Sequence, residues 1–373
     1  MGHKNRVIVS VTNDLYTDQR VHKVCLFLHE KGHDVLLVGR KRRNSIDLER
    51  RDYKTKRIKL LFEKGALFYA FYNLRLFVFL LFNKSDVLLS NDLDTLLANY
   101  LASKVKGSKL VYDTHELFTE VPELVSRPKV RKIWLKIEGW IFPKLKHVYT
   151  VNQSIADIYM KRYNTHVSVV RNVSPKWESS NISTKKELGI PENKTIIILQ
   201  GAGINVDRGA EEAIEAMKSV DHAVLIIVGD GDVVPSLKQS VKAQSMEDKV
   251  IFYGKKPYNK LMEYTFHADI GLTLDKDTNP NYKYSLPNKV FDYIHAETPI
   301  ISSNLIEIKR IVERHDVGIV LGEHSSKAIS KAINNYIEHP DILLQKKKNC
   351  KKAANVECWE NEKKVLEEIY MSI

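Results

Sequence analysis

Short apolar runs alternate with longer amphipathic stretches along most of this chain, and this alternation is the feature that most constrains its fold. Runs such as residues 6–11 and 109–113 have the length of buried strands, and the stretch from Asp94 to Lys104 between them has helical periodicity. Strands that alternate with helices form parallel βαβ units. The pattern therefore predicts an α/β protein with doubly wound parallel sheets.

A polar segment interrupts the alternation near the middle of the chain. Residues 172–185 include Pro175 and follow neither the helix nor the strand period, which is typical of a linker. A chain of 373 residues is long enough for two domains, each with its own core. We therefore predict one domain over residues 1–172 and a second over residues 186–355. Two helices are expected to close the chain, and the last, in residues 356–373, is expected to pack back on the first domain.

The segment from Ser285 to Ser302 reads as a turn, a short helix and a buried strand. Pro287 suits the start of a helix, where free backbone N–H groups can bind phosphate, and Lys289 adds a positive charge there. Asp292, one turn further on, can accept hydrogen bonds from vicinal hydroxyl groups. On spacing alone, an amphipathic core helix with two solvated charges is the favoured interpretation.

A glycine-containing loop follows the first predicted strand of the second half, at residues 200–210. Gly201 and Gly203 allow the backbone to approach a ligand, and Arg208 can clamp a diphosphate with two hydrogen bonds. The third glycine of a dinucleotide-binding fingerprint is missing, and no P-loop sequence occurs. These absences from the sequence disfavour a nicotinamide-dependent dehydrogenase and P-loop chemistry.

Acidic pairs follow several predicted strands. A D-x-D triplet can hold a divalent cation, but it is also typical of a strand-end turn with a helix N-cap, which is the favoured interpretation here. The three triplets are Asp92/Asp94, Asp230/Asp232 and Asp275/Asp277.

The sequence Asp113-Thr114-His115-Glu116 is the most polar strand end of the first half. It can supply a general base with an orienting carboxylate, two metal ligands, or a capping turn. A metal site is the weakest of the three, because no matching distal pair of ligands stands out. The sequence has no G-x-S-x-G and no cysteine beside a histidine, so acyl transfer receives little support.

Charge and cysteine content limit the partners and the compartment. The chain carries 58 Lys and Arg against 46 Asp and Glu, and the excess is concentrated at residues 40–43 and 50–59. Such patches attract phosphates, including those of anionic lipids, but no nucleic-acid recognition motif accompanies them. The three cysteines form no C-x-x-C pair, and no signal peptide is recognised. We therefore expect a cytoplasmic protein that does not bind nucleic acid.

The segment from Ala66 to Phe82 is apolar except for Asn73 and Arg75. It is slightly too short and too interrupted for a membrane span. A buried helix and a helix lying in a membrane surface both remain open, and the basic runs before it favour an anionic inner-leaflet surface.

Taken together, these segments resemble the retaining glycosyltransferases of family 4, which have the GT-B fold. The family's donor-site segment is similar to S-L-P-N-K-V-F-D-Y-I-H-A-E-T-P-I-I, and its diphosphate loop is similar to Q-G-A-G-I-N-V-D-R-G. The loops around the nucleotide resemble V-G-D-G-D and F-Y-G-K-K-P-Y. In the first half, the acceptor domain of bacterial members resembles Y-D-T-H-E-L, E-G-W-I-F-P and V-V-R-N-V. The resemblance implies two Rossmann-like domains that face each other across a cleft.

The resemblance also implies roles for single residues. Arg208 and Lys289 are expected to neutralise the leaving diphosphate, and His115 to face the reacting sugar, so these three are the candidate catalytic residues. Asp292 is expected to hold the ribose hydroxyls in place of the usual Glu, whereas Tyr284 stands where the family has an acid against the donor sugar. The full donor-side set is Gly201, Gly203, Gly229, Lys255, Lys256, Tyr284, Ser285, Leu286, Pro287, Asn288 and Asp292. The acceptor-side set is Asn13, Asp113 and Glu116.

The implied activity is transfer of a sugar from a UDP- or GDP-sugar to a glycan or lipid-linked acceptor of a cell-surface polysaccharide. Retention of anomeric configuration follows from the family, and fixed cations and helix amides are expected to act without a metal or another cofactor. A nucleotide-sugar epimerase of the same fold and an inactive sugar-nucleotide-binding subunit are the alternatives. The absence of the usual acid at Tyr284 is the best support for the inactive subunit.

Overall fold

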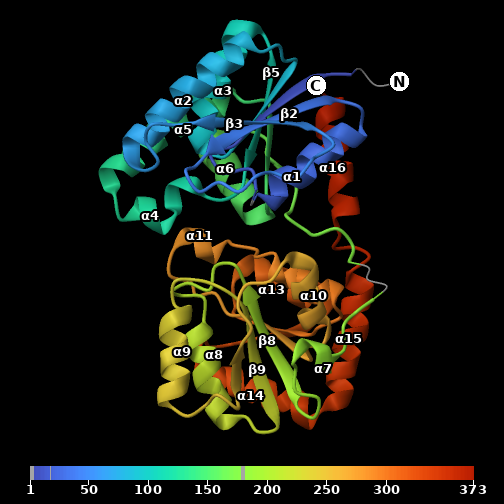
Figure 1. The fold of residues 1–373 in the computed structure, drawn as a ribbon. Coiled ribbons are helices and arrows are strands. Elements are labelled where there is room, and N and C mark those ends of the chain that lie inside the picture. The colour runs from blue at the N-terminus through green and yellow to red at the C-terminus, as the bar shows by residue number, and fades with distance from the viewer. Residues whose placement is uncertain (1–3, 17, 178–180) are drawn as a thin grey trace. The chain divides into compact units, whose positions relative to one another are not determined.

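The computed structural model describes residues 4–16, 18–177 and 181–373, and the chain divides into two compact units. Unit 1 consists of residues 1–172 and 363–373, and unit 2 of residues 173–362 (Figure 1). Part of the expected linker, residues 178–180, lies outside the described residues, as does Thr17. Between residue 170 and the start of α7 (Lys185–Leu188), the described residues form no helix or strand.

Unit 1 is built on a parallel sheet of seven strands in the order β3-β2-β1-β4-β5-β6-β7. The strands are β1 (Arg6–Ser10), β2 (Asp34–Lys41), β3 (Lys54–Lys59), β4 (Val87–Asn91), β5 (Lys109–Thr114), β6 (His147–Thr150) and β7 (Ser168–Val169). The α-helices are α1 (Gln19–Glu30), α2 (Gly65–Phe82), α3 (Leu93–Lys106), α4 (Pro122–Val125), α5 (Pro128–Ile141), α6 (Gln153–Tyr163) and the end of α16 (Trp359–Met371). Short 3-10 turns occur at Phe118–Glu120 and Phe142–Lys144.

Strand β3 was not expected from the sequence, because its residues K-T-K-R-I-K read as part of a basic loop. It is an edge strand of the sheet, and only Ile58 is buried within it. Lysines on an exposed edge prevent pairing with other strands, which explains how such a polar segment forms a strand.

Unit 2 is built on a parallel sheet of six strands in the order β10-β9-β8-β11-β12-β13. The strands are β8 (Thr195–Gly201), β9 (Ala223–Gly229), β10 (Val250–Phe252), β11 (Ile270–Thr273), β12 (Ile300–Ser302) and β13 (Gly318–Val320). Besides α7, the helices are α8 (Ala210–Ala216), α9 (Val234–Ala243), α10 (Tyr258–Phe266), α11 (Pro280–Lys283), α12 (Lys289–His295), α13 (Ile306–His315), α14 (Ser326–Glu338) and α15 (Pro340–Ala353), with a 3-10 turn at Met217–Ser219.

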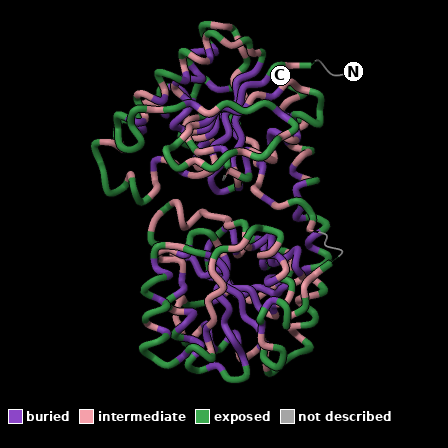
Figure 2. The backbone as a smooth tube through the Cα atoms, viewed as in Figure 1, coloured by how far each residue is buried: buried purple, intermediate pink, exposed green. Residues whose placement is uncertain are grey.

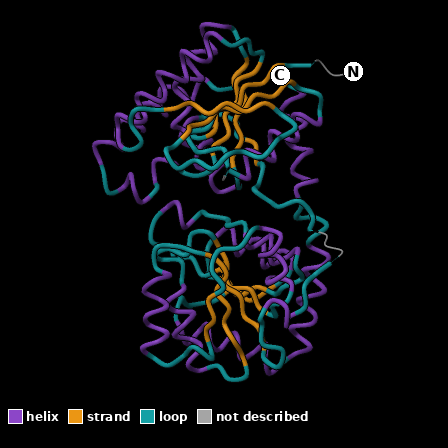
Figure 3. Tube along the Cα trace, viewed as in Figure 1, coloured by secondary structure: helices purple, strands orange, loops and turns teal. Residues whose placement is uncertain are grey.

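The strands of unit 2 are apolar on both sides because helices cover both faces of the sheet (Figure 3). Ile197 and Leu199 of β8 pack into one core with α8, α9 and α14, whereas Ile196 and Ile198 pack into the other with α12, α13 and α15. The central strands of each unit are accordingly buried along their length (Figure 2). The prediction of an α/β, doubly wound parallel fold is therefore confirmed.

One expectation about the end of the chain was wrong. Three helices, not two, follow β13, because His339 and Pro340 divide the apolar pattern into α14 and α15 before α16 begins. Pro340 is suited to the first position of a helix, so it ends one helix and starts the next. The last residues, 363–373, belong to unit 1.

Candidate functional site

Arg208 lies at the end of the loop that follows β8. Gly209, which starts α8, has a φ of +75°, and a Cβ atom there would lie 2.4 Å from Leu274. Only glycine fits such a position, and it brings this loop against the end of β11. The Nη1 atom of Arg208 lies 3.0 Å from Oδ1 of Asp275, and its guanidinium lies 4.2 Å from the ring centroid of Tyr282. The guanidinium is therefore held by a carboxylate and an aromatic ring.

The charges around Arg208 form a compact group at the ends of β8 and β11. Burial disfavours the charge on Arg208, but Asp275 outweighs it and raises the pKa of the guanidinium. Burial lowers the pKa of Lys289, against the attraction of Asp275. Because Asp275 is completely buried, only the two cations can meet a ligand, and they suit a diphosphate.

The ends of β8 and β9 approach each other more closely than side chains would allow. Gly229 pairs with Gly201 in the sheet, and its φ is +153°. A Cβ atom at Gly229 would lie 1.8 Å from the carbonyl oxygen of Gly201. Gly203 follows in the same loop, so the glycines predicted on the donor side lie together where the loop that carries Arg208 begins.

Asp292 lies in α12 with its carboxylate buried among hydrogen-bond donors. Its Oδ1 atom accepts from Tyr258 Oη at 2.9 Å and from Ser174 Oγ at 3.1 Å, and its Oδ2 atom accepts from Gln200 Nε2 at 3.1 Å. Two hydroxyl groups of the protein thus already donate to Asp292 Oδ1, and Asp292 is the residue expected to bind a ribose. A ribose hydroxyl at Oδ1 would join or replace Tyr258 or Ser174, so the site suits an alcohol donor.

The remaining donor-side residues lie on two connections. Tyr284 ends α11, and Ser285 donates to the Tyr282 carbonyl at 2.9 Å. Leu286 packs against the core of unit 2, so its side chain supports the loop, whereas Asn288 is exposed at the start of α12. The other members of this group are Pro287, on the same connection, and Lys255 and Lys256, on the loop after β10.

In unit 1, His115 lies between two carboxylates at the ends of β4 and β5. Its Nδ1 atom is 3.2 Å from Asp92 Oδ2, and its Nε2 atom is 3.1 Å from Asp113 Oδ2. A ring with an acceptor at each nitrogen is satisfied only when both nitrogens carry protons. Burial works against this charge, but Asp92 and Asp113 outweigh it and raise the pKa of His115 to about 9.

This arrangement argues against the general-base interpretation of the Asp113–Glu116 segment. A histidine that keeps both protons near neutral pH is a poor general base. It can act as a cation, since both of its N–H groups already face carboxylates. His115 is 20% exposed through its side chain, so one edge of the imidazolium is open to a ligand.

Asp113 had been expected on the acceptor side, and the structure corrects this. It is completely buried and forms a two-point ion pair with Arg20, whose Nε and Nη2 atoms lie 3.0 and 2.7 Å from its oxygens. Arg20 and His115 outweigh the effect of burial and lower the pKa of Asp113. A buried carboxylate with these partners positions His115 and does not contact an acceptor. Asn13, by contrast, is exposed and Glu116 is half-buried at the same edge of the sheet.

Carboxylates of two D-x-D triplets make structural contacts. Asp92 was expected to cap a helix, but its side chain makes no cap hydrogen bond to α3 and instead accepts from the backbone N–H of His115 at 2.9 Å. Asp275 pairs with Arg208, and Asp277 with Lys283 at 3.0 Å. Across the described part of the chain, no group of three or more His, Cys, Asp or Glu side chains is arranged to hold a metal ion.

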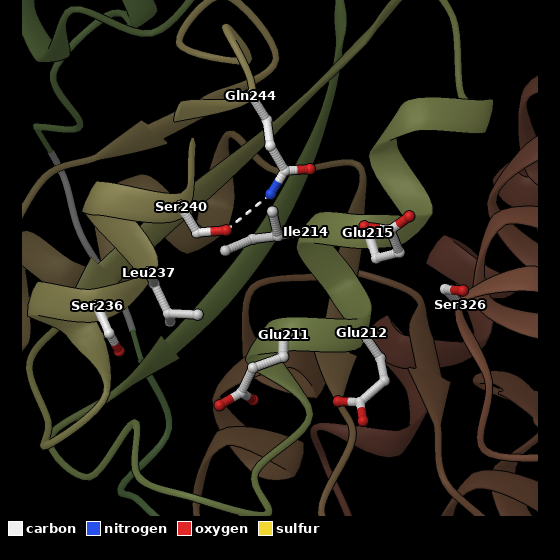
Figure 4. A pocket seen from close by; sticks show the side chains of 9 residues that line it. All are labelled: Glu211, Glu212, Ile214, Glu215, Ser236, Leu237, Ser240, Gln244 and Ser326. Carbon is white, nitrogen blue, oxygen red and sulfur yellow. Dashed lines mark hydrogen bonds between the residues drawn. The ribbon is translucent and has the colours of Figure 1, made fainter. Parts of the chain in front are cut away.

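A hollow of about 440 Å³ opens on unit 2 between α8 and α9 (Figure 4). Glu211, Glu212 and Glu215 of α8 line one side, and Ser240 and Gln244 of α9 bond to each other at 2.7 Å on the other. An excess of carboxylates with no cation does not suit a diphosphate. This hollow therefore contributes nothing to the candidate site.

Several residues that build the site were not identified from the sequence. Arg20 reads as a charge in an amphipathic helix, and Gln200 as the end of an apolar strand. Tyr258 and Tyr282 contact the site from helices whose positions follow only from tertiary packing. Asp275 was identified as part of a D-x-D triplet, but the triplet was interpreted as a turn. Nothing in the local sequence indicates that Asp275 pairs with Arg208.

The chain forms two parallel α/β units, and the candidate residues lie on loops at the ends of their strands. This architecture fits the GT-B fold, and the comparisons with known proteins agree. The family model described as "Glycosyltransferase Family 4" matches residues 18–173, and the model described as "Glycosyl transferases group 1" matches residues 180–356. The chain belongs to the group 1 glycosyltransferases with the GT-B fold. A search of curated protein sequences found no match.

Solved structures share this fold at low sequence identity. Sucrose-phosphate synthase from Thermosynechococcus elongatus has a TM-score of 0.82 and 16% identity, over 99% of each chain. Anabaena HepE in complex with UDP has a TM-score of 0.73 and 15% identity, over 99% of this chain and 100% of that one. WaaG, a glycosyltransferase involved in lipopolysaccharide biosynthesis, has a TM-score of 0.72 and 13% identity, over 97% and 99%.

Proposed function

We propose that this protein is a retaining, metal-independent glycosyltransferase that uses a UDP- or GDP-sugar. The cationic group formed by Arg208, which pairs with the buried Asp275, and the nearby Lys289 carries the proposal. Cleavage of a sugar–phosphate bond builds negative charge on the departing diphosphate, and cations fixed before the reaction stabilise that charge. HepE, which shares the fold, binds UDP and UDP-glucose.

Metal independence is proposed because two carboxylates of the D-x-D triplets are already paired with side chains of the protein. Asp275 pairs with Arg208, and Asp92 pairs with His115. These two carboxylates therefore orient cationic side chains of the protein and are not free to hold a bridging metal ion. Asp292 is proposed to bind the ribose, and the positive charge of the His115 imidazolium to stabilise the negative charge that develops on the leaving group. Retention of the anomeric configuration is proposed to proceed by same-face displacement, because none of the described residues of the candidate site stands out as a covalent nucleophile.

The acceptor is proposed to be a glycan or a lipid-linked glycan of a cell-surface polysaccharide. We propose that the protein works in the cytoplasm, where free thiols persist; Cys25, Cys350 and Cys358 are all free and buried. Bacterial members of the family that the first half resembles act on such acceptors, and WaaG is named for lipopolysaccharide biosynthesis.

The test begins with a screen of sugar nucleotides for thermal stabilisation, because a ligand that binds only the folded state raises the melting temperature. The stabilising donor is then incubated with and without glycan acceptors, with and without EDTA. We expect slow donor hydrolysis alone, faster transfer with an acceptor, no effect of EDTA, and an α-linked product from an α-linked donor by NMR. Release of an epimerised sugar from the donor alone would identify an epimerase, and binding without turnover would identify an inactive subunit.

A further inference from the structure

Helix α2 presents an apolar stripe to solvent along its whole length. Every fourth residue from Phe68 to Leu80 packs against unit 1, but only 22% of the helix is buried inside the structure. The opposite side carries Leu67, Leu74, Val78 and Phe82, which are 63%, 58%, 44% and 84% exposed. The outer side of a helix in a globular protein normally carries charged or polar residues. A continuous apolar stripe of this kind marks an interaction surface.

The helix is fixed to unit 1 and lies on its surface. Contrary to the expectation from its sequence, α2 is long and apolar enough to cross a membrane, by length and composition alone. Its polar side chains are, however, bonded within unit 1: Tyr72 donates to the Val11 carbonyl, and Asn73 donates to the Asp94 carbonyl at 2.7 Å and accepts from the Ala98 N–H at 3.3 Å. Removing α2 from the sheet to span a bilayer would break these bonds and uncover the core.

Positive charge is concentrated around this helix. Residues 40–84 contain thirteen Lys and Arg against four Asp and Glu, an excess of nine out of the chain's net +12. The basic loop after β2 lies beside the start of α2, since the backbone N–H of Arg43 donates to Glu63 Oε1 at 3.1 Å. Arg75, on α2 itself, donates to the carbonyl of Lys59 at the end of β3 at 2.7 Å.

The carboxyl end of α2 also adjoins basic side chains. Lys106 of α3 donates to the Leu80 carbonyl at 2.8 Å, and its neighbour Val105 is 69% exposed. Helices α2, α3 and α5 pack side by side (Figure 1). A pocket of about 280 Å³ opens between the ends of α3 and α5, and lysines line it: Lys104, Lys109, Lys144 and Lys146.

We propose that this surface, the exposed stripe of α2 with its basic surroundings, rests on a bilayer that contains anionic lipid. Apolar side chains enter the boundary between headgroups and acyl chains, and the cations meet lipid phosphates. A second copy of the chain is a poorer occupant, because pairing α2 with α2 would bring two strongly basic segments together. The proposal does not depend on the sugar or on the transfer reaction.

The test is co-sedimentation of the full chain with vesicles of phosphatidylcholine, with or without phosphatidylglycerol, at low and high salt. We expect binding to the anionic vesicles at low salt only. The double variant Leu74→Glu/Val78→Glu removes the apolar stripe, and Arg42→Ser/Arg43→Ser/Lys64→Ser/Lys84→Ser removes exposed charge. Each is expected to weaken partitioning about tenfold or more. Arg51 is left unchanged because it donates to the Leu15 carbonyl at 2.7 Å and so has a structural role.

The controls match these changes on unit 2. Leu344→Glu replaces one leucine of similar exposure, 54%, on α15, and Lys242→Ser/Lys331→Ser/Lys348→Ser/Lys352→Ser removes the same number of exposed cationic side chains. Both are expected to bind vesicles like the original chain, and all variants are checked for folding by circular dichroism. Equal recovery in the supernatant with neutral and anionic vesicles would overturn the proposal. So would a chain that dimerises through α2 in sedimentation velocity and does not bind vesicles.

Discussion

The Nη1 atom of Arg208 lies 3.0 Å from Oδ1 of Asp275, and the carboxylate is completely buried whereas the arginine side chain is 26% exposed. A ligand therefore cannot reach the carboxylate of Asp275, but it can reach part of the Arg208 side chain. A guanidinium offers five N–H donors, so contact with Asp275 leaves others free for phosphate oxygens.

Replacing Arg208 by alanine is expected to lower kcat for donor turnover by about 10²–10³-fold, because one preorganised charge at the leaving group is lost. Rates are measured with the donor found in the thermal screen. Arg310→Ala is the matched control, since Arg310 is 47% exposed on α13 and pairs only locally with Glu307. Unchanged turnover in Arg208→Ala would remove this residue from the mechanism.

Asp275→Asn keeps the shape of the side chain but removes the charge that orients Arg208. A misplacement of about 1 Å in a positioned group can cost up to about 10²-fold in rate, so we expect a smaller loss than in Arg208→Ala. The double variant Arg208→Ala/Asp275→Asn should be no slower than Arg208→Ala alone. Additive losses in the double variant would show that Asp275 does not act through Arg208.

Asp292→Asn is expected to weaken nucleotide binding while leaving the fold intact. A hydrogen bond to a charged group contributes about 1.5–3 kcal/mol, which corresponds to roughly 10–100-fold in Kd. Isothermal titration calorimetry with UDP and GDP measures the change, and Asp277→Asn, at an exposed carboxylate of the same unit, serves as the control. An identical affinity in Asp292→Asn would contradict the ribose role.

The charge on His115 should give donor turnover an alkaline limit. Its pKa is raised from 6.5 to about 9, so the folded chain holds a proton that the unfolded chain loses above about pH 6.5. The stabilisation by Asp92 and Asp113 is therefore fully present below pH 6.5 and is lost as the pH rises through about 9. The rate should fall over the same alkaline range. His115→Gln should be slower and lack this limit, whereas His166→Gln, at an exposed histidine of unit 1, should retain it.

Removing Asp113 should destabilise unit 1. Asp113→Ala leaves the guanidinium of Arg20 buried without its carboxylate, and breaking one partner of a buried ion pair costs about 3–5 kcal/mol. Urea unfolding followed by circular dichroism measures the loss, and Asp157→Ala, at an exposed site on α6, should change stability little. A transition at the same urea concentration in Asp113→Ala would show that the pair contributes no net stability.

The fold could be predicted from sequence because its signal is local and repeated. Each apolar run and each helical stretch indicates its own element, and their alternation specifies parallel sheets without knowledge of any contact. The signal failed where an element depends on its neighbours. Strand β3 is polar and forms at a sheet edge, and the boundary between α14 and α15 depends on one proline.

The candidate site was predictable only as far as its residues lie in recognisable segments. Arg208, Lys289, Asp292 and His115 stand in such segments. Asp275 is 67 positions away from its partner Arg208, and Tyr258 and Ser174 are 34 and 118 positions away from Asp292. Arg20 is 93 positions away from Asp113, the carboxylate that it shares with His115. Nothing local in the sequence specifies these distant contacts, because they arise when strand ends converge in the folded sheet.

Helix α16 begins in unit 2 and ends in unit 1, so the polypeptide passes between the units twice. A gene fragment that stops after the linker would encode unit 1 without residues 363–373, and would lose the bond from Lys363 to Glu30 and that from Lys31 to Glu367. Recombination between relatives that exchanges only the first half would therefore join unit 1 to a foreign C-terminal segment. A functional chimera has to carry both pieces together, which ties the evolution of the two ends of the chain to each other.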